Sequence, residues 1–346
     1  MGPAAVPGAS SGLVAAYRLR WKRRRLLWRA LRARHQLTCR ADRTGEIPEA
    51  PILCFSVVRN EAARLPFFLG HYRRAGVSHF LFVDNGSDDG SAGLLLDQPD
   101  VSLWQTQASY RGSRFGMDWL TWLQIRYGHG KWCLTADADE ILTYPHADTR
   151  SLRGLTDWLD RQGVPAFGAL MLDMYPKGPL GQQAYAPGQD PCEVLPWFDP
   201  GPFRAVRQHP AGNLWLQGGL RERVFFQDDP ARSPTLNKIP LVKWDRRYVY
   251  LNSTHSLLPP RLNALYSGPG GPGPSGVLLH SKFLPEIVLK SESERQRGQH
   301  FSRPEDFDPY YARIMAGPDL WHPGALRYEG WQQLEALGLM TRGGWT

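Results

Sequence analysis

Three acidic side chains follow the end of one apolar segment of the sequence. Residues 132–134 predict a buried strand, and Asp137, Asp139 and Glu140 come shortly after it. Side chains two positions apart lie on the same face of an extended chain, so Asp137 and Asp139 are expected to point the same way. Carboxylates held close together repel each other unless a cation or a proton lies between them. These residues therefore indicate a site for a hard divalent cation, which takes oxygen ligands and keeps positions open for phosphate. A solvated acidic turn is the alternative interpretation.

Polar residues also follow two earlier predicted strands. Residues 52–58 and 79–83 have the length and branched content of buried strands, and they precede Asn60, Glu61 and Asp84. In parallel α/β sheets, ligands bind over the carboxyl ends of the strands. Three separate loops are therefore expected to converge on one crevice. The alternatives are a helix N-cap for Asn60 and turn formation for Asp84.

Strands and helices alternate through the first half of the chain. This alternation predicts an α/β fold with a mostly parallel sheet and helices on both faces. The second half is less regular and rich in Pro, Gly and Asp, with short strands expected within 219–226, 241–244 and 248–251. Further strands are predicted at 101–106, 132–136 and 167–175, and helices at 65–72, 114–127, 151–162, 286–300, 305–315 and 331–337.

A late apolar segment carries another group of polar residues. Residues 277–283 predict a strand in which His280 and Lys282 share one face. The Gly- and Pro-rich residues 267–276 before it predict a mobile loop that resembles a lid. His280 is a candidate metal ligand, and His255 competes with it for this role. The alternative for His280 is a half-buried histidine with satisfied hydrogen bonds.

The positive charge of the chain is concentrated near its beginning. The 346 residues carry a formal net charge of +8, and residues 1–50 hold eleven Arg or Lys and three acids, which accounts for all of it. The neutral remainder argues against a basic nucleic-acid groove in the folded body. The four cysteines show no paired spacing, which favours a reducing compartment, and we expect a cytoplasmic protein. No stretch is long and apolar enough to predict a membrane span, and residues 1–16 lack the order of a signal peptide.

The basic beginning of the chain predicts an extension separate from the main body. Residues 1–13 are expected to be disordered, whereas residues 17–37 predict a cationic helix. Tyr17, Trp21 and Trp28 recur at helical spacing, so this helix could lie on an anionic membrane surface, at the inner face of the cell membrane. A helix packed on the body and a non-specific polyanion binder are the alternatives. The chain thus divides into a basic extension at 1–45, a main domain at 50–283 and a helical C-terminal region at 284–346.

Five stretches of the chain form a recognisable set when they are taken together in their order and spacing. They are Val58-Arg59-Asn60-Glu61, Phe82-Val83-Asp84-Asn85-Gly86-Ser87-Asp88-Asp89-Gly90, Trp132-Cys133-Leu134-Thr135-Ala136-Asp137-Ala138-Asp139-Glu140, Leu172-Asp173-Met174-Tyr175-Pro176 and Leu278-Leu279-His280-Ser281-Lys282-Phe283. This set resembles the family 2 glycosyltransferases of GT-A fold, and it looks closest to the bacterial branch called glycosyltransferase-like family 2. The resemblance implies that residues 50–283 form a GT-A catalytic domain, with a Rossmann-like, mostly parallel sheet flanked by helices.

The resemblance assigns roles around a nucleotide-sugar donor. It implies that Asn60, Glu61 and Asp84 surround the nucleoside, which is uridine in many relatives. Asp137 and Asp139 match the Asp-x-Asp motif, whose acids hold the metal and the ribose in the family. Many relatives have two acids where this chain has Asp84 followed by an asparagine, which leaves the nucleoside open. Which of Asp139 and its neighbouring glutamate faces the metal is also open.

The remaining donor contacts would stabilise charge on the leaving group. In many GT-A enzymes a late histidine completes the metal shell, a role that His280 would take here. A mixed nitrogen and oxygen shell favours Mn²⁺ over Mg²⁺. Lys282 and Arg114, with Arg111 as a further candidate, could reach the diphosphate, where a metal and a cation stabilise the transition state more than the ground state. Exposed helix arginines are the alternative for Arg111 and Arg114.

An inverting enzyme also needs a base that takes the proton of the acceptor hydroxyl. Our candidate is Asp173, with Asp199 and Glu222 behind it; an acid that only pairs with an arginine is the alternative. We expect a metal-dependent inverting glycosyltransferase that moves a sugar, most simply from a UDP-sugar, to a glycan or glycolipid acceptor in polysaccharide biosynthesis. One alternative is a sugar-phosphate nucleotidyltransferase, although residues 58–62 lack the glycines usual after the first strand of that class. Another is a non-enzymatic protein that binds membranes or polyanions through its basic N-terminus.

Overall fold

Four parallel strands form the first half of the central sheet in this computed structural model, which describes residues 9–288, 290–292 and 308–346. Each was predicted from its apolar segment. They lie side by side as β4 (Val101–Gln105), β3 (His79–Asp84), β2 (Ile52–Val58) and β5 (Trp132–Thr135). An edge strand, β1 (Thr38–Ala41), pairs antiparallel with β4. It was not predicted, because its residues are mostly exposed and carry no apolar alternation.

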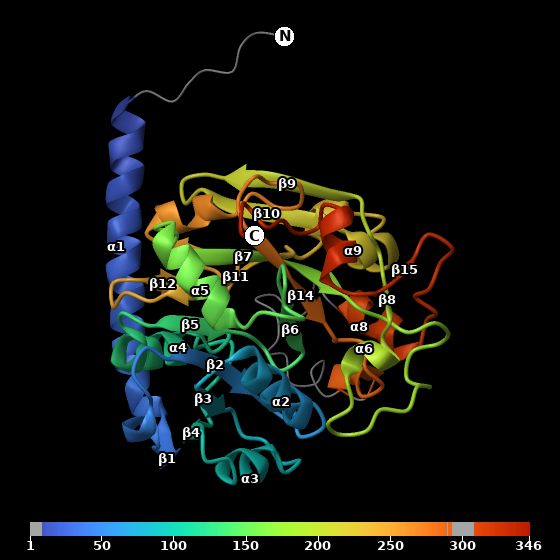
Figure 1. Cartoon of the computed structure of the whole chain (residues 1–346), viewed down its shortest axis with the longest axis horizontal. Helices are drawn as coiled ribbons and strands as arrows, with labels where there is room; N and C mark the ends of the chain where they lie inside the picture. The colour runs from blue at the N-terminus through green and yellow to red at the C-terminus, as the bar shows by residue number, and fades with distance from the viewer. Residues whose placement is uncertain (1–8, 289, 293–307) are drawn as a thin grey trace.

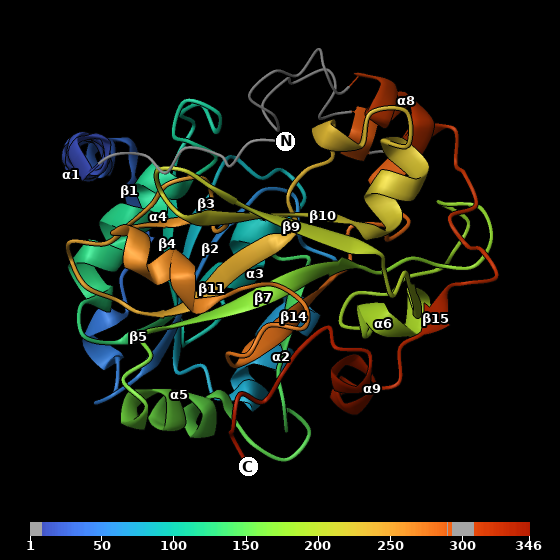
Figure 2. The ribbon, with the colours of Figure 1, turned by 90° about the horizontal axis from the view of Figure 1, so that it is seen from above.

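The second half of the sheet is mixed. β11 (Asn237–Lys243) lies between β5 and β7 (Ala166–Asp173) and is antiparallel to both. β14 (Ser275–His280) runs parallel to β7, and β6 (Glu140–Thr143) closes the sheet antiparallel to β14. The nine strands have the order β1-β4-β3-β2-β5-β11-β7-β14-β6, and all but β1, β11 and β6 point the same way. Helices flank this mostly parallel sheet (Figures 1 and 2), which confirms the predicted α/β fold class.

Alternate side chains of β2 enter two hydrophobic cores, one on each face of the sheet. Ile52 and Cys54 face one core, and Leu53 and Phe55 face the other. The first core is covered by α2 (Leu65–Ala75), α3 (Ser91–Leu96) and α5 (Leu152–Arg161), and the second by α4 (Met117–Leu123) with the π-helix Gln124–Gly128.

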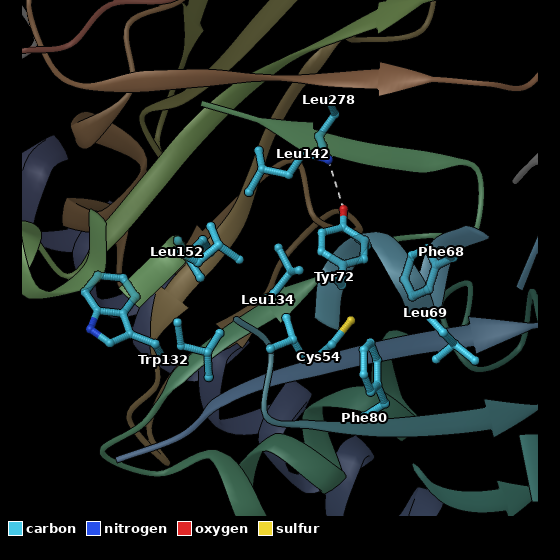
Figure 3. Close-up of a cluster of buried hydrophobic side chains, with 14 of the residues drawn as sticks. Cys54, Phe68, Leu69, Tyr72, Phe80, Trp132, Leu134, Leu142, Leu152 and Leu278 are labelled. Carbon is cyan, nitrogen blue, oxygen red and sulfur yellow. Dashed lines mark hydrogen bonds between the residues drawn. The ribbon is translucent and has the colours of Figure 1, made fainter. Parts of the chain in front are cut away.

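Tyr72 of α2 connects the first core to the strand that follows the acidic motif (Figure 3). Its hydroxyl donates to the carbonyl of Glu140 at 2.9 Å and accepts from the amide of Leu142 at 2.9 Å. The ring is fully buried among apolar neighbours that include Phe68. The packing of α2 is thereby linked to the position of the β5–β6 turn, which carries Asp137 and Asp139.

The segment before β11 differs from the prediction. Strands were expected within 219–226, but a π-helix, Arg221–Phe225, occupies this segment. Its buried residues, Arg221 and Phe225, lie four positions apart, and Arg223 between them is only half-buried, which fits a helical rather than a two-residue period. A hairpin of β9 (Phe203–Gln208) and β10 (Asn213–Gly218) precedes it and was not predicted.

The two ends of the chain pack against the body. α1 (Ala9–Ala33) begins earlier than predicted, so residues 9–13 are helical rather than disordered, whereas residues 1–8 lie outside the described residues. No helix in the described part of the chain is long and apolar enough to cross a membrane. The predicted lid at 267–276 is held by the C-terminal residues, since Gly270 donates to the carbonyl of Gly338 at 2.8 Å.

Short elements complete the second half. The predicted helix at 305–315 is seen from residue 308, and most of the one predicted at 286–300 lies outside the described residues. The remaining elements are α6 (Pro191–Val194), β8 (Trp197–Phe198), β12 (Val249–Tyr250), β13 (Leu257–Leu258), α8 (Asp308–Met315), β15 (Leu326–Arg327) and α9 (Trp331–Ala336).

Candidate active site

One cavity of about 440 Å³ opens where the parallel strands end. Glu61 after β2 and Asn85 after β3 line it, together with Asp137 and Asp139 from the β5–β6 turn and His280 at the end of β14. The loops that were expected to converge therefore meet at this cavity, as the carboxyl ends of parallel strands do.

His280 is held between two carboxylates. Its Nδ1 lies 2.6 Å from Oδ1 of Asp173, and its Nε2 lies 3.2 Å from Oδ2 of Asp139. The first contact follows from the sheet register, because His280 and Asp173 are direct neighbours on β14 and β7. Burial alone would lower the pKa of His280, but the ion pairs with Asp139 and Asp173 outweigh it, and the pKa is raised.

Asp173 is fully engaged by its neighbours. Arg221 donates from Nε to Oδ2 at 2.7 Å and from Nη2 to Oδ1 at 2.9 Å, and both side chains are buried. Burial opposes the charged carboxylate, but Arg221 and His280 hold the pKa of Asp173 well below its usual range. This environment fits an acid that orients Arg221 and His280 better than it fits the base that we expected, since both carboxylate oxygens already accept charge-assisted hydrogen bonds.

The two acids placed behind Asp173 are also paired. Asp199 accepts from Arg223 at 2.8 Å and from the hydroxyl of Tyr175, and Glu222 accepts from Arg204. Neither acid is among the residues that line the cavity. Neither Asp199 nor Glu222 is therefore an unpaired acid that could replace Asp173 as the base.

Asp137 and Glu140 have different partners from Asp139. Nζ of the buried Lys238, on β11, lies 2.7 Å from Oε1 of Glu140 and 3.8 Å from Oδ2 of Asp137. Glu140 is 1% exposed, whereas the side chain of Asp137 is 49% exposed. Loss of water in the cavity and the nearby charge of Glu140 raise the pKa of Asp137. Asp139 is thus the acid that faces His280, and Glu140 neutralises Lys238.

The donor types around His280 fit a divalent cation. A metal-binding histidine commonly donates its other ring N–H to a carboxylate. Asp173 takes that place here, which leaves Nε2 on the side of Asp139. Asp137 and Asp139 line the same cavity. His280 contacts Asp139 and Asp173 directly, and among the described residues no group of three or more His, Cys, Asp or Glu forms a preformed metal centre.

Two predicted nucleoside contacts, Asn60 and Asp84, are not among the residues that line the cavity. Asn60 exchanges hydrogen bonds with Asp88, donating from Nδ2 to Oδ1 at 2.8 Å. Asp84 is fully buried and accepts from the amide of Ser87 at 3.2 Å and from Gln105 at 3.1 Å. Both side chains tie neighbouring loops together, and neither is a lining residue. Their sequence neighbours Glu61 and Asn85 line the cavity instead.

Of the two basic residues predicted to reach the diphosphate, one lines the cavity and the other does not. Lys282 lines the cavity, where Nζ lies 5.2 Å from the centre of the Tyr310 ring. Arg114 is not among the residues that line it. Arg114 donates to Asp118 at 2.7 Å and to the carbonyl of Tyr250 at 2.7 Å. It precedes α4 in a turn with φ of 56°, which directs its side chain to the acid one helical turn ahead.

Sequence reasoning did not find Lys238, Arg221 or Arg59, all of which line the cavity. Lys238 comes shortly before residues 241–244, for which a strand was predicted. In the structure this buried strand begins earlier, at Asn237, and therefore includes Lys238. His255, the competing ligand, also lines the cavity and donates from Nδ1 to the carbonyl of Asn237 at 2.6 Å. Burial lowers the pKa of His255 to about 3, so it is neutral and keeps a lone pair on Nε2.

Comparisons with known proteins identify no family for this chain. No family model and no curated protein matches it. Among solved structures, it is similar to a 4-diphosphocytidyl-2C-methyl-D-erythritol synthase, with 14% identity and a TM-score of 0.25 over 41% of this chain and 66% of that chain. It is also similar to a Bacillus anthracis protein assigned as a glucose-1-phosphate thymidylyltransferase, in complex with sucrose, with 10% identity and a TM-score of 0.28 over 76% of this chain and 82% of that chain. At these TM-scores neither likeness bears on the substrate, and membership of the glycosyltransferases stays a prediction.

Proposed function

We propose that this chain transfers a sugar from a nucleotide-sugar donor that binds in the cavity. The observation that carries the proposal is the meeting of Asp137 and Asp139 with His280 in one cavity at the carboxyl ends of the strands. Lys282 and Arg59 add positive charge to the same walls. A nucleoside diphosphate leaving group gains negative charge as its bond to the sugar breaks, and such a site suits that charge.

The residues of the chain divide this task between binding and orientation. Asp137, Asp139 and His280 would hold Mn²⁺ or Mg²⁺, which when bound neutralises charge on the diphosphate. Asp173 and Arg221 fix the imidazole of His280 from behind, so that its Nε2 stays directed at Asp139.

An acceptor, which we take to be a glycan or glycolipid, would enter the same cavity on the side of Trp215 and His255. The indole of Trp215 offers a face on which a sugar ring can stack. The neutral Nε2 of His255 can accept a hydrogen bond from a sugar hydroxyl. Inversion at the anomeric carbon is the stereochemistry that the resemblance implies.

The test is a panel of nucleotide-sugars incubated with the purified full chain, with and without Mn²⁺, in which release of nucleoside diphosphate is measured. We expect one or more donors to turn over, and Asp139→Asn to lower the rate about 100-fold or more, since even the loss of a group that only hydrogen-bonds a metal ligand costs about 10–100-fold. Asp97→Asn is the matched control, because Asp97 is an exposed acid outside the cavity. The proposal fails if no nucleotide-sugar binds or turns over.

The same preparation tests the second candidate, sugar-phosphate nucleotidyl transfer, which is the reaction class named for the Bacillus anthracis protein. In that reaction a nucleoside triphosphate and a sugar 1-phosphate yield pyrophosphate and the nucleotide-sugar. Pyrophosphate formation that depends on Asp139, without turnover of any nucleotide-sugar alone, would replace glycosyl transfer by this reaction.

A further inference from the structure

Helix α1 carries two stripes of apolar side chains on opposite faces. The inner stripe packs on the body, where Leu19 and Leu26 join a cluster with Val249 and Leu258. Ala30 and Ala33, further along the same face, are also buried. The helix is fixed in this position, because Arg29 donates to Asp118 at 2.8 Å and to the carbonyl of Gly112 at 2.8 Å.

The outer stripe consists of large side chains that face solvent. Tyr17, Trp21 and Trp28 are 60%, 54% and 65% exposed, and Leu13 and Val14 near the start of the helix are 75% and 52% exposed. At about 100° per residue, the aromatic stripe lies about 180° from the inner stripe around the helix axis. Figures 1 and 2 show α1 along one side of the molecule, with its N-terminal turns extending beyond the sheet. Such an exposed aromatic surface requires a physical explanation.

Positive charge accompanies this stripe. The sequence holds no acidic residue before Asp42, and the α1 segment contains eight Arg or Lys residues. Arg20, Arg24, Arg25 and Arg32 are exposed on the outward half of the helix, beside the aromatic rings. The body beyond residue 50 is neutral overall, so the cationic surface of the chain is largely this helix.

We propose that the outward face of α1 docks the chain on an anionic lipid bilayer. Tyr and Trp rings favour the level of the lipid headgroups, and arginines beside them pair with lipid phosphates while their stems cover apolar surface. A nucleic acid would use the arginines but has no place for the exposed Leu13 and Val14, which a bilayer takes up. Because the inner face is packed on the body, docking fixes the orientation of the whole fold at the membrane. This inference does not depend on the reaction in the cavity.

Co-sedimentation of the full chain with vesicles tests the proposal. One set of vesicles is phosphatidylcholine alone, and the other contains phosphatidylserine as well. We expect binding to the anionic vesicles only, weakened at least tenfold when salt is raised from about 0.1 M to about 0.5 M. The double substitution Trp21→Ser with Trp28→Ser is expected to reduce binding at least tenfold. Val206→Ser is the matched control, since Val206 is 61% exposed on β9 and should leave binding unchanged.

Three results would overturn the proposal. The first is equal binding to both vesicle types, or binding to neither. The second is loss of binding in the Val206→Ser control to the same extent as in the double variant. The third is a vesicle-free dimer in light scattering that becomes monomeric only in the double variant, which would assign the stripe to a second copy of the chain. An unchanged thermal midpoint in circular dichroism verifies that the double variant folds, as expected for side chains more than half exposed.

Discussion

Replacement of Asp173 by asparagine should destabilise the fold strongly, because no orientation of the amide suits its surroundings. Oδ2 of Asp173 accepts from Nε of Arg221, while Oδ1 accepts from Nη2 of Arg221 and from His280. An asparagine places its NH₂ group against a donor in either flip, and it leaves the buried guanidinium without a counter-charge. Removal of one partner of a buried ion pair costs about 3–5 kcal/mol. We expect about 3 kcal/mol for Asp173→Asn, the lower end of that range, since in the better flip the amide oxygen in place of Oδ1 still accepts from Arg221 and from His280.

Urea unfolding at pH 7 in metal-free buffer measures this cost, and an exposed ion pair supplies the control. Arg73 and Asp100 make two hydrogen bonds of 2.6 and 2.8 Å, but their side chains are 36% and 27% exposed. Asp100→Asn should therefore cost less than about 1 kcal/mol. Arg221→Met is expected to cost about 2 kcal/mol, because Asp173 keeps His280, and the double variant should cost about 2 kcal/mol less than the sum.

The reasoning is refuted if Asp173→Asn and Asp100→Asn lower the free energy of unfolding equally, or if the Asp173 and Arg221 substitutions are additive. A second measurement addresses the proposed metal role. Mn²⁺ affinity, followed by electron paramagnetic resonance of the free ion, should fall about 10–100-fold in Asp173→Asn, as it does when a carboxylate that hydrogen-bonds a metal-binding histidine is removed. An unchanged Mn²⁺ affinity would show that the ion pair of Asp173 and Arg221 stabilises the fold but does not contribute to metal binding.

Three further predictions concern the fold. Burial lowers the pKa of His71 in the folded chain to about 4. Between about pH 6.5 and 4 the unfolded chain therefore binds a proton that the folded chain does not bind. The free energy of unfolding falls by up to about 3 kcal/mol across this range. In His71→Phe the free energy of unfolding, measured by urea titration at several pH values, should depend less on pH over this range. An unchanged dependence on pH would show that His71 is not the group responsible. Tyr72→Phe strands the amide of Leu142 and should cost about 2 kcal/mol by the same method. Gly168→Ala would place a Cβ 2.3 Å from Cβ of Tyr266. We expect this clash to lower the free energy of unfolding by about 1–3 kcal/mol and to lower the midpoint of thermal unfolding accordingly. An unchanged midpoint would mean that Tyr266 can move aside.

The first half of the sheet could be predicted because each strand is a buried apolar segment with a clear end. Residues 52–58 match β2 at both ends, and the helix that begins at Leu65 ends at Gly76, whose φ of 99° suits glycine. Convergence of the acidic turn with His280 followed from the same logic, since parallel strands bring their carboxyl ends to one edge.

The parts of the site that escaped prediction depend on irregular backbone or on distant partners. Arg221 lies in a π-helix, which has no simple periodic signal in the sequence. Its role depends on the ion pair with Asp173, which is 48 residues away along the chain. Lys238 stands in a strand whose first two residues are polar, so the segment looked like a loop before residue 241. The helix predicted from residue 114 begins at Met117, and Arg114 lies in a left-handed turn before it, where its side chain pairs with Asp118.

The insertion of β11 between β5 and β7 has a consequence for the order in which the molecule assembles during synthesis. When residue 135 leaves the ribosome, β5 has only one neighbour, and its other edge waits about a hundred residues for β11. An open edge of this kind invites pairing with another nascent chain. The same late strand brings Lys238, so the charge of Glu140 has no internal partner until then. The strand β11 thus joins the two halves of the sheet, and the cavity is completed only later, when β14 pairs with β7 and β6 and brings His280.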